Sequence, residues 1–391
     1  MMCYNNLMKI GFFTDTYLPV VNGVEISIET FRKSLGKMGH KVFIYAPYTP
    51  GYKDKNPNVF RFQSIRVIKK PEMRLAFPFL PKDHFGKILD FKLDIAHSHT
   101  PFSMGLLAKY IADHQKIPLV YTHHTHYPEY AKFYMKEKII SPLLGRFLSA
   151  WYSNLSNTII VPSYKMKRLL KEYGVKKKKP IYVLPTGVNV KIFKESKKAG
   201  LKIKEELGIA KKNKVLIFVG RMGKEKNPGF LLKATKEVLK KRNVILLMVG
   251  DGPFLNGLKE MAKKLGIEKN TIFTGAIPYQ KIPAYYQASD IFVFSSLTET
   301  QGIVILEALA CGLPVVALKD DAFKGIIINN KNGFLIKKPW PENFAKKILE
   351  ILKKPFLYKR FSISSRKIAK DFSAANQAKK LINIYKSLIE I

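Results

Sequence analysis

Residues 214–220 (KVLIFVG) decide the fold, because they form a short and nearly continuous apolar run that ends on glycine. Residues 244–250 (VILLMVG) repeat the pattern after a segment long enough for one helix. Strands buried on both faces of a parallel sheet have such sequences, whereas strands with one solvated face alternate apolar and polar residues. The two runs therefore predict neighbouring parallel strands joined by a crossover helix.

Similar apolar runs occur throughout the chain, and helical patterns separate them. They predict an α/β fold with two Rossmann-like, doubly wound parallel-sheet domains facing a cleft. Open parallel sheets bind ligands beyond the carboxyl ends of their strands, so functional residues should directly follow strands. The other predicted strands are residues 8–14, 41–46, 94–97, 119–122, 158–161, 271–274, 291–295 and 314–317.

The boundary between the two sets of strands is expected in residues 185–210, which are rich in turn residues and lysines. This predicts a first domain over residues 1–190 and a second over residues 191–372. Residues 373–391 carry apolar side chains at helical spacing, which indicates a terminal helix packing back toward the first domain.

The composition is that of a globular protein. The 391 residues are 47% hydrophobic and 25% charged, which excludes wholesale disorder. No window approaches 18 uninterrupted apolar residues, and the first residues lack the apolar stretch and cleavage site of a signal peptide. The two cysteines, Cys3 and Cys311, form no disulfide framework and fit a reducing compartment, so we expect a cytoplasmic protein.

The formal net charge of +39 is unusual and would attract polyanions such as nucleic acid, anionic lipid or phosphorylated ligands. Lysine supplies most of this charge, whereas base-reading proteins favour arginine. The mixture of basic and aromatic residues expected of a single-strand binder is not concentrated in one place. We therefore expect no nucleic-acid partner, and a general drift of composition toward lysine stays open as the alternative explanation.

The common nucleotide-binding fingerprints are missing. Residues 250–253 (GDGP) begin like a dinucleotide loop but lack its third glycine, and no GxxxxGK[ST] phosphate loop occurs. After residues 214–220, however, Arg221 and Lys226 lie between a predicted strand and a helix. They could form a cationic clamp for a diphosphate, and the alternative is a pair of exposed cations in a lysine-rich chain.

Two carboxylates follow the strand at residues 291–295. Glu299 lies in the loop at the strand end, and Glu307 lies on an otherwise apolar helix, where a carboxylate is costly unless it has a partner. Backbone N–H groups of Thr300, Gln301 and Gly302 at the helix start would suit an anion. The alternative is one loop glutamate and one salt-bridged helix glutamate.

Five of the eight histidines cluster after predicted strands of the first domain, in the patterns HxH and HHxH. These patterns can chelate zinc, but no cysteine or acidic ligand has convincing spacing. We expect no metal site, and a histidine that hydrogen-bonds a sugar hydroxyl instead. The five are His97, His99, His123, His124 and His126.

Eight motifs in one order carry a resemblance that covers nearly the whole chain. They are FFTDTYLPVVNGVEIS, HSHTPFSMG, THHTHYPEY, LPTGVN, GRMGKEKNP, GDGP, FTG and ETQGIVILEALACGLPVV. The chain resembles the retaining nucleotide-sugar glycosyltransferases of family 4, also called group 1, which have the GT-B fold. The opening motif, THHTHYPEY and ETQG look most like those of 1,2-diacylglycerol 3-glucosyltransferases.

The resemblance implies a role for each matching residue. Residues 1–190 would bind the acceptor and residues 191–372 the donor. The paired glycine of the family's first loop is Asn22-Gly23 here, a departure that leaves the loop geometry open. Arg221 and Lys226 would hold the donor diphosphate, and Glu299 and His124 would lie at the donor sugar. Glu307 would bind the ribose, and the loop that contains Gly23 would allow close approach to the donor phosphates.

The implied reaction is transfer of a hexose, expected to be glucose from UDP-glucose, to a lipid acceptor, expected to be diacylglycerol, with no required metal. A sugar or inositol-type acceptor is the alternative, and a polyanion-binding protein is the distant one. Residues 60–92 mix cations with phenylalanines, as lipid-facing segments do, and indicate a peripheral protein on the anionic inner face of the cell membrane. The alternative is that these phenylalanines belong to the core.

Overall fold

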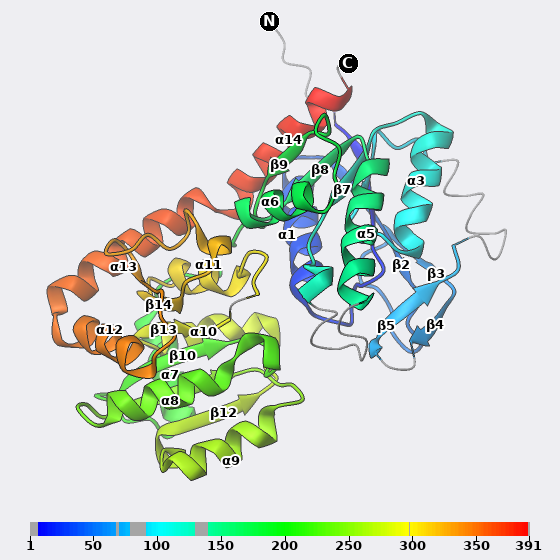
Figure 1. Cartoon of the computed structure of the whole chain (residues 1–391). Helices are drawn as coiled ribbons and strands as arrows, with labels where there is room; N and C mark the ends of the chain where they lie inside the picture. The colour runs from blue at the N-terminus through cyan, green and yellow to red at the C-terminus, as the bar shows by residue number, and fades with distance from the viewer. Residues whose placement is uncertain (1–6, 68–69, 79–90, 130–139, 297, 390–391) are drawn as a thin grey trace, which may run out of the picture. The chain divides into compact units, whose positions relative to one another are not determined.

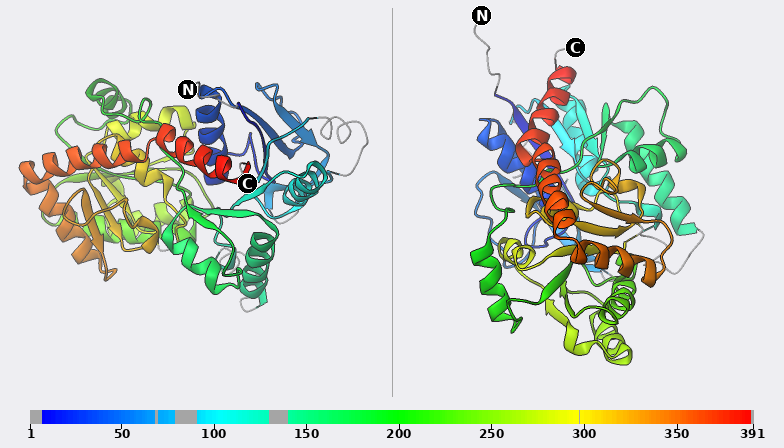
Figure 2. Two further views of the ribbon diagram at one scale, coloured as in Figure 1. Left: turned by 90° about the horizontal axis from the view of Figure 1, so that it is seen from above. Right: turned by 90° about the vertical axis from the view of Figure 1, so that its left-hand side faces the viewer.

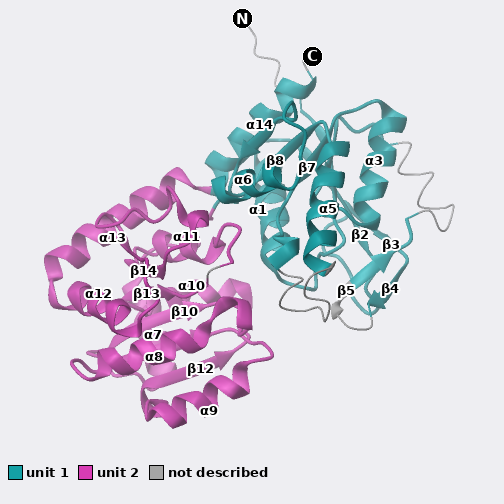
Figure 3. Ribbon diagram, viewed as in Figure 1, with its two compact units in different colours: residues 1–187, 374–391 teal, residues 188–373 magenta. Residues whose placement is uncertain are grey.

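The computed structural model describes residues 7–67, 70–78, 91–129, 140–296 and 298–389 (Figure 1). The chain divides into two compact units (Figure 3). Unit 1 comprises Met1–Gly187 and Ala374–Ile391, and unit 2 comprises Val188–Ser373. Each unit contains a parallel sheet with helices, so the predicted pair of doubly wound domains is confirmed.

The sheet of unit 1, as far as the structure describes it, has seven strands in the order β3-β2-β1-β6-β7-β8-β9, and each neighbouring pair is parallel. The order reverses between β1 and β6, because β1 leads to β2 on one side while β6 leads to β7 on the other. The strands are β1 (Lys9–Phe13), β2 (Lys41–Pro47), β3 (Val59–Phe62), β6 (Ile95–Ser98), β7 (Leu119–Thr122), β8 (Thr158–Val161) and β9 (Ile181–Val183).

Helices cover both faces of this sheet. One face packs against α1 and α14, and the other packs against α3, α5 and α6. The side chain of Asn22 caps α1 by accepting from the backbone N–H of Val24 and Glu25. The helices are α1 (Gly23–Lys37), α3 (Ser103–Gln115), α5 (Ile140–Leu155), α6 (Tyr164–Glu172) and α14 (Ala374–Ile389).

The last helix, α14, belongs to unit 1 although it follows unit 2 in the sequence. Its residues Ala378, Leu381 and Tyr385 are buried in the same core as Ile28 of α1 and Phe12 of β1. Helix α14, in red in Figures 1 and 2, contacts α1, in blue. The apolar spacing of this segment thus serves the core of the first sheet.

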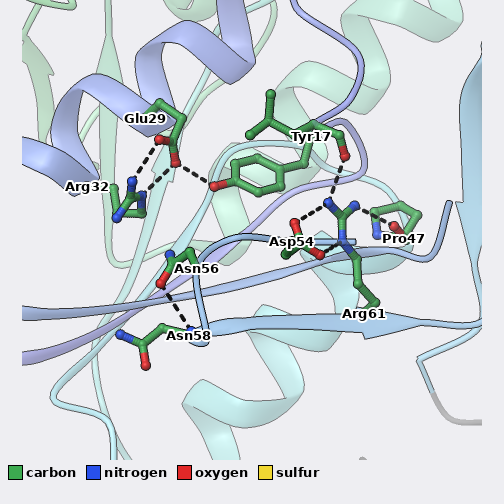
Figure 4. A network of polar contacts seen from close by, with 9 residues as sticks. Tyr17, Glu29, Arg32, Pro47, Asp54, Asn56, Asn58 and Arg61 are labelled. Atoms are coloured by element: carbon green, nitrogen blue, oxygen red, sulfur yellow. Dashed lines mark hydrogen bonds and ion pairs between the residues drawn. The ribbon is translucent and has the colours of Figure 1, made fainter. Parts of the chain in front are cut away.

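A small antiparallel pair, β4 (Ser64–Val67) and β5 (Lys70–Ala76), follows β3. The neighbouring loops are tied down by Arg61 of β3, which pairs with Asp54 at 2.8 Å and donates to the carbonyls of Pro47 and Leu18 (Figure 4). In the same network Tyr17 donates to Glu29, which also pairs with Arg32 (Figure 4). The loop that follows β1 is therefore held on two sides.

The sheet of unit 2 has six strands in the described part of the chain, in the order β12-β11-β10-β13-β14-β15, and each neighbouring pair is parallel. The predicted strand at residues 214–220 is the central β10. The order reverses between β10 and β13. The strands are β10 (Lys214–Val219), β11 (Val244–Val249), β12 (Thr271–Gly275), β13 (Ile291–Phe294), β14 (Val315–Leu318) and β15 (Gly333–Ile336).

The connection from β10 through α8 to β11 and the connection from β13 through α11 to β14 run in opposite directions across the sheet. Because such connections are right-handed, α8 and α11 lie on opposite faces of the sheet. Helix α8 packs with α9 and α12, and α11 packs with α10 and α13. Of the helices that the structure describes, none is both long and apolar enough to cross a membrane. The helices are α7 (Lys197–Glu206), α8 (Pro228–Leu239), α9 (Leu255–Leu265), α10 (Ile282–Gln287), α11 (Ile303–Ala310), α12 (Pro341–Lys353) and α13 (Pro355–Asp371), with short 3-10 turns η1 (Lys224–Lys226), η2 (Glu268–Asn270), η3 (Tyr279–Lys281) and η4 (Asp321–Phe323).

Candidate active site

The candidate donor site of unit 2 lies where the strand order reverses. Arg221 and Lys226 follow β10, and Glu299 follows β13. Since β10 pairs directly with β13, the segments leaving their carboxyl ends are neighbours. This is the position at which open parallel sheets bind ligands.

Hydroxyl groups hold these two segments together. The Oγ of Ser295 lies 2.9 Å from the carbonyl oxygen of Lys226 and 2.8 Å from that of Asn227. Ser296 and Thr298 both donate to the carbonyl of Glu225. The carbonyl groups of three successive residues, Glu225 to Asn227, thus accept hydrogen bonds from the segment after β13. These bonds fix the backbone position of Lys226.

The side chains of Lys226 and Glu299 meet directly, with Nζ 2.5 Å from Oε1. Glu299 is only 7% exposed, and its backbone N–H donates to Asp320, whose other carboxylate oxygen accepts from Ala322 at the start of η4. Arg221 is exposed at the beginning of the same segment. The structure therefore brings Lys226 and Glu299 into contact and leaves Arg221 beside them on the chain, at the solvent.

The segment from Thr300 to Gly302 leads into α11. Gln301 and Gly302 are buried, whereas Thr300 is half-buried. Gly302 caps the helix with φ of 76°, a left-handed conformation that favours glycine. A Cβ there would lie 3.0 Å from the side chain of Ile305 and 3.1 Å from that of Phe323, so a larger residue would also require these side chains to shift.

Glu307 of α11 is buried and has two tyrosine partners. Tyr279 donates to Oε1 at 2.8 Å, and Tyr286 donates to Oε2 at 2.9 Å. Burial raises the pKa of Glu307 to about 7, although both hydrogen bonds act in the opposite direction. The sequence indicated that this carboxylate needs a partner, but it did not reveal the two tyrosines, which lie 28 and 21 residues away.

The GDGP motif after β11 serves the backbone of this site. A Cβ on Gly250 would lie 2.0 Å from the carbonyl oxygen of Gly220, and one on Gly252 would lie 2.8 Å from Met222 N. In return Met222 N–H donates to the carbonyl of Asp251 at 2.9 Å. The two glycines therefore allow the backbone of the loop after β11 to contact the backbone of the loop after β10. A glycine at the end of a strand often marks such a close approach of two backbones.

In unit 1 three of the clustered histidines form a stack. The rings of His97 and His99 lie 4.3 Å apart, and those of His99 and His124 lie 5.2 Å apart. His97 is held by Tyr385 of α14 at 2.5 Å and by Thr122 at 2.7 Å. The terminal helix therefore contacts the base of the stack, a link across 288 residues that sequence spacing does not show.

A hydrogen bond of 2.9 Å joins Nδ1 of His99 to Nε2 of His124. Burial holds the pKa of His124 at about 3 and that of His99 well below its usual value, so both rings are neutral near pH 7. The other nitrogen of His99, Nε2, is buried with no partner among the described residues. A buried nitrogen without a partner costs less as an acceptor than as an N–H donor, so the proton of His99 is favoured on Nδ1, where it is donated to Nε2 of His124. The neutral ring of His124 then carries its own proton on Nδ1.

The remaining two histidines bind tyrosines. Nδ1 of His123 lies 2.9 Å from the hydroxyl of Tyr121, and Nε2 of His126 lies 2.8 Å from that of Tyr173. Burial lowers the pKa of His123 to about 3. Within the described ranges no group of three histidine, cysteine, aspartate or glutamate side chains is placed to hold a metal ion.

Asp15, which sequence analysis did not select, organises the loop after β1. Its carboxylate accepts from Thr100 at 2.5 Å, from Ser103 at 2.6 Å and from the backbone N–H of Met104 at 3.1 Å. Burial raises its pKa, and these hydrogen bonds oppose the shift. An aspartate directly after a buried strand was the available signal, and its partners at the start of α3 became visible only in the fold.

Gly23 is the first residue of α1 and is exposed. A Cβ placed on it would meet nothing within 4 Å. The packing of the described chain therefore sets no requirement for glycine here, in contrast to Gly302.

The segment 60–92 lies partly outside the described residues, which leave out 68–69 and 79–90. Phe62 is buried in the core beside α3, and Phe60 and Phe91 pack against the same cluster. Arg61 is engaged with Asp54. The alternative reading of these three phenylalanines, that they belong to the core, is the correct one.

Two family models match the chain. Residues 21–192 match the model described as Glycosyltransferase Family 4, and residues 201–368 match the model described as Glycosyl transferases group 1. The matches fall on the two parallel-sheet units respectively.

Two curated relatives are alpha-monoglucosyldiacylglycerol synthases. The protein from Streptococcus pneumoniae is 38% identical over an alignment of 343 positions, which covers 84% of this chain and 75% of that protein. The protein from Acholeplasma laidlawii is 31% identical over an alignment of 401 positions, which covers 98% of each chain.

Among solved structures, Anabaena HepE in complex with UDP and glucose superposes with a TM-score of 0.79 at 20% sequence identity. The match covers 97% of this chain and 100% of HepE. The likeness is one of fold.

Proposed function

Because the chain belongs to the group 1 glycosyltransferases of family 4, we propose that it moves glucose from UDP-glucose to diacylglycerol with retention of configuration. The chain has the GT-B architecture of that family and is a hexosyltransferase that uses a nucleotide-sugar donor. The names of the two synthases support glucose and diacylglycerol as sugar and acceptor. The observation that carries the proposal is the contact of Lys226 with Glu299 at the sheet's reversal point.

The cations of unit 2 would act on the leaving group. When the bond from the anomeric carbon to the diphosphate breaks, negative charge develops on the phosphate oxygens, and Lys226 and Arg221 would stabilise it. The helix start at Thr300, Gln301 and Gly302 would add backbone donors. With this positive charge supplied by the protein, we propose that transfer needs no bound metal.

The carboxylates would bind hydroxyl groups of the donor. Glu299 uses one oxygen for Lys226, so the other oxygen would accept from a sugar hydroxyl. Glu307 would accept from the ribose, because a carboxylate has about four lone-pair sites and the two tyrosines occupy only two. The open space at Gly23 would admit the donor phosphates to unit 1.

His124 would meet the donor sugar as a hydrogen-bond donor. Its Nε2 is occupied by His99, so Nδ1–H is the group left for a sugar hydroxyl. The acceptor hydroxyl would attack the anomeric carbon on the face that the diphosphate leaves, and its proton would pass to the departing phosphate oxygen.

The test is an assay of the full chain with UDP-, GDP- and ADP-glucose and diacylglycerol in mixed micelles. We expect glucosyldiacylglycerol from UDP-glucose, an α-anomeric proton by NMR, and unchanged turnover in EDTA. Transfer to inositol phosphate but not to diacylglycerol would support the alternative acceptor. Absence of transfer from every donor would overturn the proposal.

The lipid acceptor and the net charge of +39 also support a place at the anionic inner face of the cell membrane. Cations near such a surface each contribute about 1 kcal/mol of attraction. We propose this location for the enzyme.

A further inference from the structure

Helix α5 of unit 1 exposes a stripe of large apolar side chains. Leu143, Leu144, Phe147 and Trp151 are 57%, 59%, 66% and 37% exposed. Their spacing of three and four residues places them on one face of the helix. A helix that covers a sheet normally turns its polar face outward, so this face is apolar where it should be polar.

The opposite face of α5 anchors the helix. Gly145 lies so close to the backbone of Tyr127 and Pro128 that a Cβ would come within 3.0 Å of both. Tyr152 is fully buried and donates to the carbonyl of Gly105 in α3 at 2.6 Å. In the part of the chain that the structure describes, the stripe therefore faces outward, because the packing contacts of α5 at Gly145 and Tyr152 lie on the other side of the helix.

A cluster of lysines lies next to the C-terminal end of α5, where the stripe ends. Asn154 of α5 donates to the carbonyl of Gly174 at 3.2 Å and accepts from the backbone N–H of Lys176 at 2.9 Å. Lys179 donates to the carbonyl of Ser156. These contacts tie the loop at 174–179 to α5, and Lys176, Lys177 and Lys178 are exposed on it.

We propose that the α5 surface, defined as Leu143, Leu144, Phe147, Trp151 and Lys176–Lys178, docks unit 1 onto an anionic membrane. Leucine, phenylalanine and tryptophan on one helix face enter the boundary between headgroups and acyl chains. Lysines beside them meet lipid phosphates. The inference rests on the proposed lipid acceptor and names the surface that would bring the enzyme to it.

A second copy of the chain fits this surface less well. Self-association would bring two lysine clusters together on molecules that each carry +39, and like charges oppose such contacts. Helix α5 itself contains no acidic residue that could pair with the lysines of a copy. Charge complementarity therefore favours an anionic lipid surface.

The first experiment is co-sedimentation of the full chain with vesicles of phosphatidylcholine alone or mixed with phosphatidylglycerol. We expect binding only to the mixed vesicles and weaker binding at high salt. The triple variant Lys176→Ser, Lys177→Ser, Lys178→Ser should bind about a hundredfold more weakly. Lys197→Ser, Lys198→Ser, Lys202→Ser changes three exposed lysines of α7 and is the matched control.

The apolar contribution is tested with Leu143→Ser, Phe147→Ser, and the matched control is Phe356→Ser, Ile363→Ser on exposed positions of α13. The first variant should lose at least about tenfold in vesicle affinity and the control none. The chain has two tryptophans, so Trp340→Phe leaves Trp151 as the sole reporter. Its emission should shift to shorter wavelength when mixed vesicles are added.

Unchanged vesicle affinity in both α5-surface variants would overturn the proposal, as would unchanged Trp151 emission. A dimer that the Leu143→Ser, Phe147→Ser variant dissociates would assign the surface to self-association instead. Activity is measured separately with diacylglycerol in detergent micelles, where the variants should match the unmodified chain. Micellar transfer without any vesicle binding would overturn the docking surface alone, whereas absence of micellar transfer would count against the proposed function.

Discussion

Lys226 and Glu299 lie 73 residues apart in the sequence, yet their side chains form an ion pair of 2.5 Å. Each follows a strand, and the two strands are neighbours at the point where the order of the sheet reverses. Serine and threonine hydroxyls after β13 hold the backbone that carries the lysine. The pair is thus placed by the sheet and by specific hydrogen bonds.

Lys226→Ala and Glu299→Ala should each lower turnover by about a hundredfold, because each removes a group that we propose to contact the donor in the transition state. The double variant should lose less than the product of the single losses, since the two side chains are in contact. Lys224→Ala, on an exposed residue of the same turn, is the control. Near-normal turnover in both single variants, with the thermal midpoint unchanged, would show that the donor site is misplaced.

Glu307→Gln should change how stability depends on pH. The folded pKa of about 7 exceeds the ordinary 4.5, so the folded chain holds a proton that the unfolded chain releases. The free energy of unfolding should therefore fall as pH rises from 4.5 to 7, by up to roughly 3 kcal/mol from this group.

The Gln variant should flatten that slope in denaturant titrations. Burial also raises the pKa of Glu25, in unit 1, to about 7. Glu25→Gln is therefore the matched variant, because it removes a carboxyl group with a similar pKa from the other unit. An identical slope in the Glu307→Gln variant and the unmodified chain would contradict the assignment.

Acid should destabilise unit 1 through its buried histidines. The pKa of His123 falls from 6.5 to about 3 on folding, so below pH 6.5 the unfolded chain binds protons that the folded chain does not. Stability should be fully present above pH 6.5 and decline as pH drops toward 3. His123→Leu should make this decline shallower in circular dichroism measurements, whereas changing the exposed His114 to Asn should leave it unaltered.

The tautomer of His124 should depend on His99. If His99 Nδ1–H donates to His124 Nε2, nitrogen-15 NMR of labelled histidine will show His124 protonated on Nδ1. His99→Asn can keep a donor near the position of Nδ1 and should retain turnover, whereas His99→Leu should lose about tenfold and mix the tautomers. Equal turnover of the Asn and Leu variants would exclude a positioning role for His99.

Gly250→Ala should destabilise unit 2 by at least about 3 kcal/mol, because its Cβ would collide with the backbone of Gly220 at a positive φ. Gly257→Ala is the matched change: it lies within α9 with nothing near its Cβ, and it should stabilise by about 1 kcal/mol. Thermal unfolding of the two variants is the measurement. Equal shifts of the two midpoints would refute the close approach of the loops.

The sequence by itself determined the class of fold and the positions at which to search for a site. Runs such as Val244–Val249 are buried on both faces, so their composition alone identifies a parallel sheet. Because ligand sites follow strands in such sheets, the order of residues along the chain was enough to select Arg221, Lys226 and Glu299. The edge strands Ile181–Val183 and Gly333–Ile336 were missed, since a run this short has no periodicity of its own and is found only where its apolar residues stand out from the neighbouring sequence.

Only the tertiary structure decided which of these residues meet and which apolar side chains are covered. The partners of Glu307 and His97 come from elements distant in the sequence, and hydrogen bonds between such elements leave no local signature. Phe60 and Phe147 are both phenylalanines beside cations, yet Phe60 packs against the core and Phe147 faces solvent. Burial depends on what the rest of the chain places against a side chain, and local spacing does not contain that information.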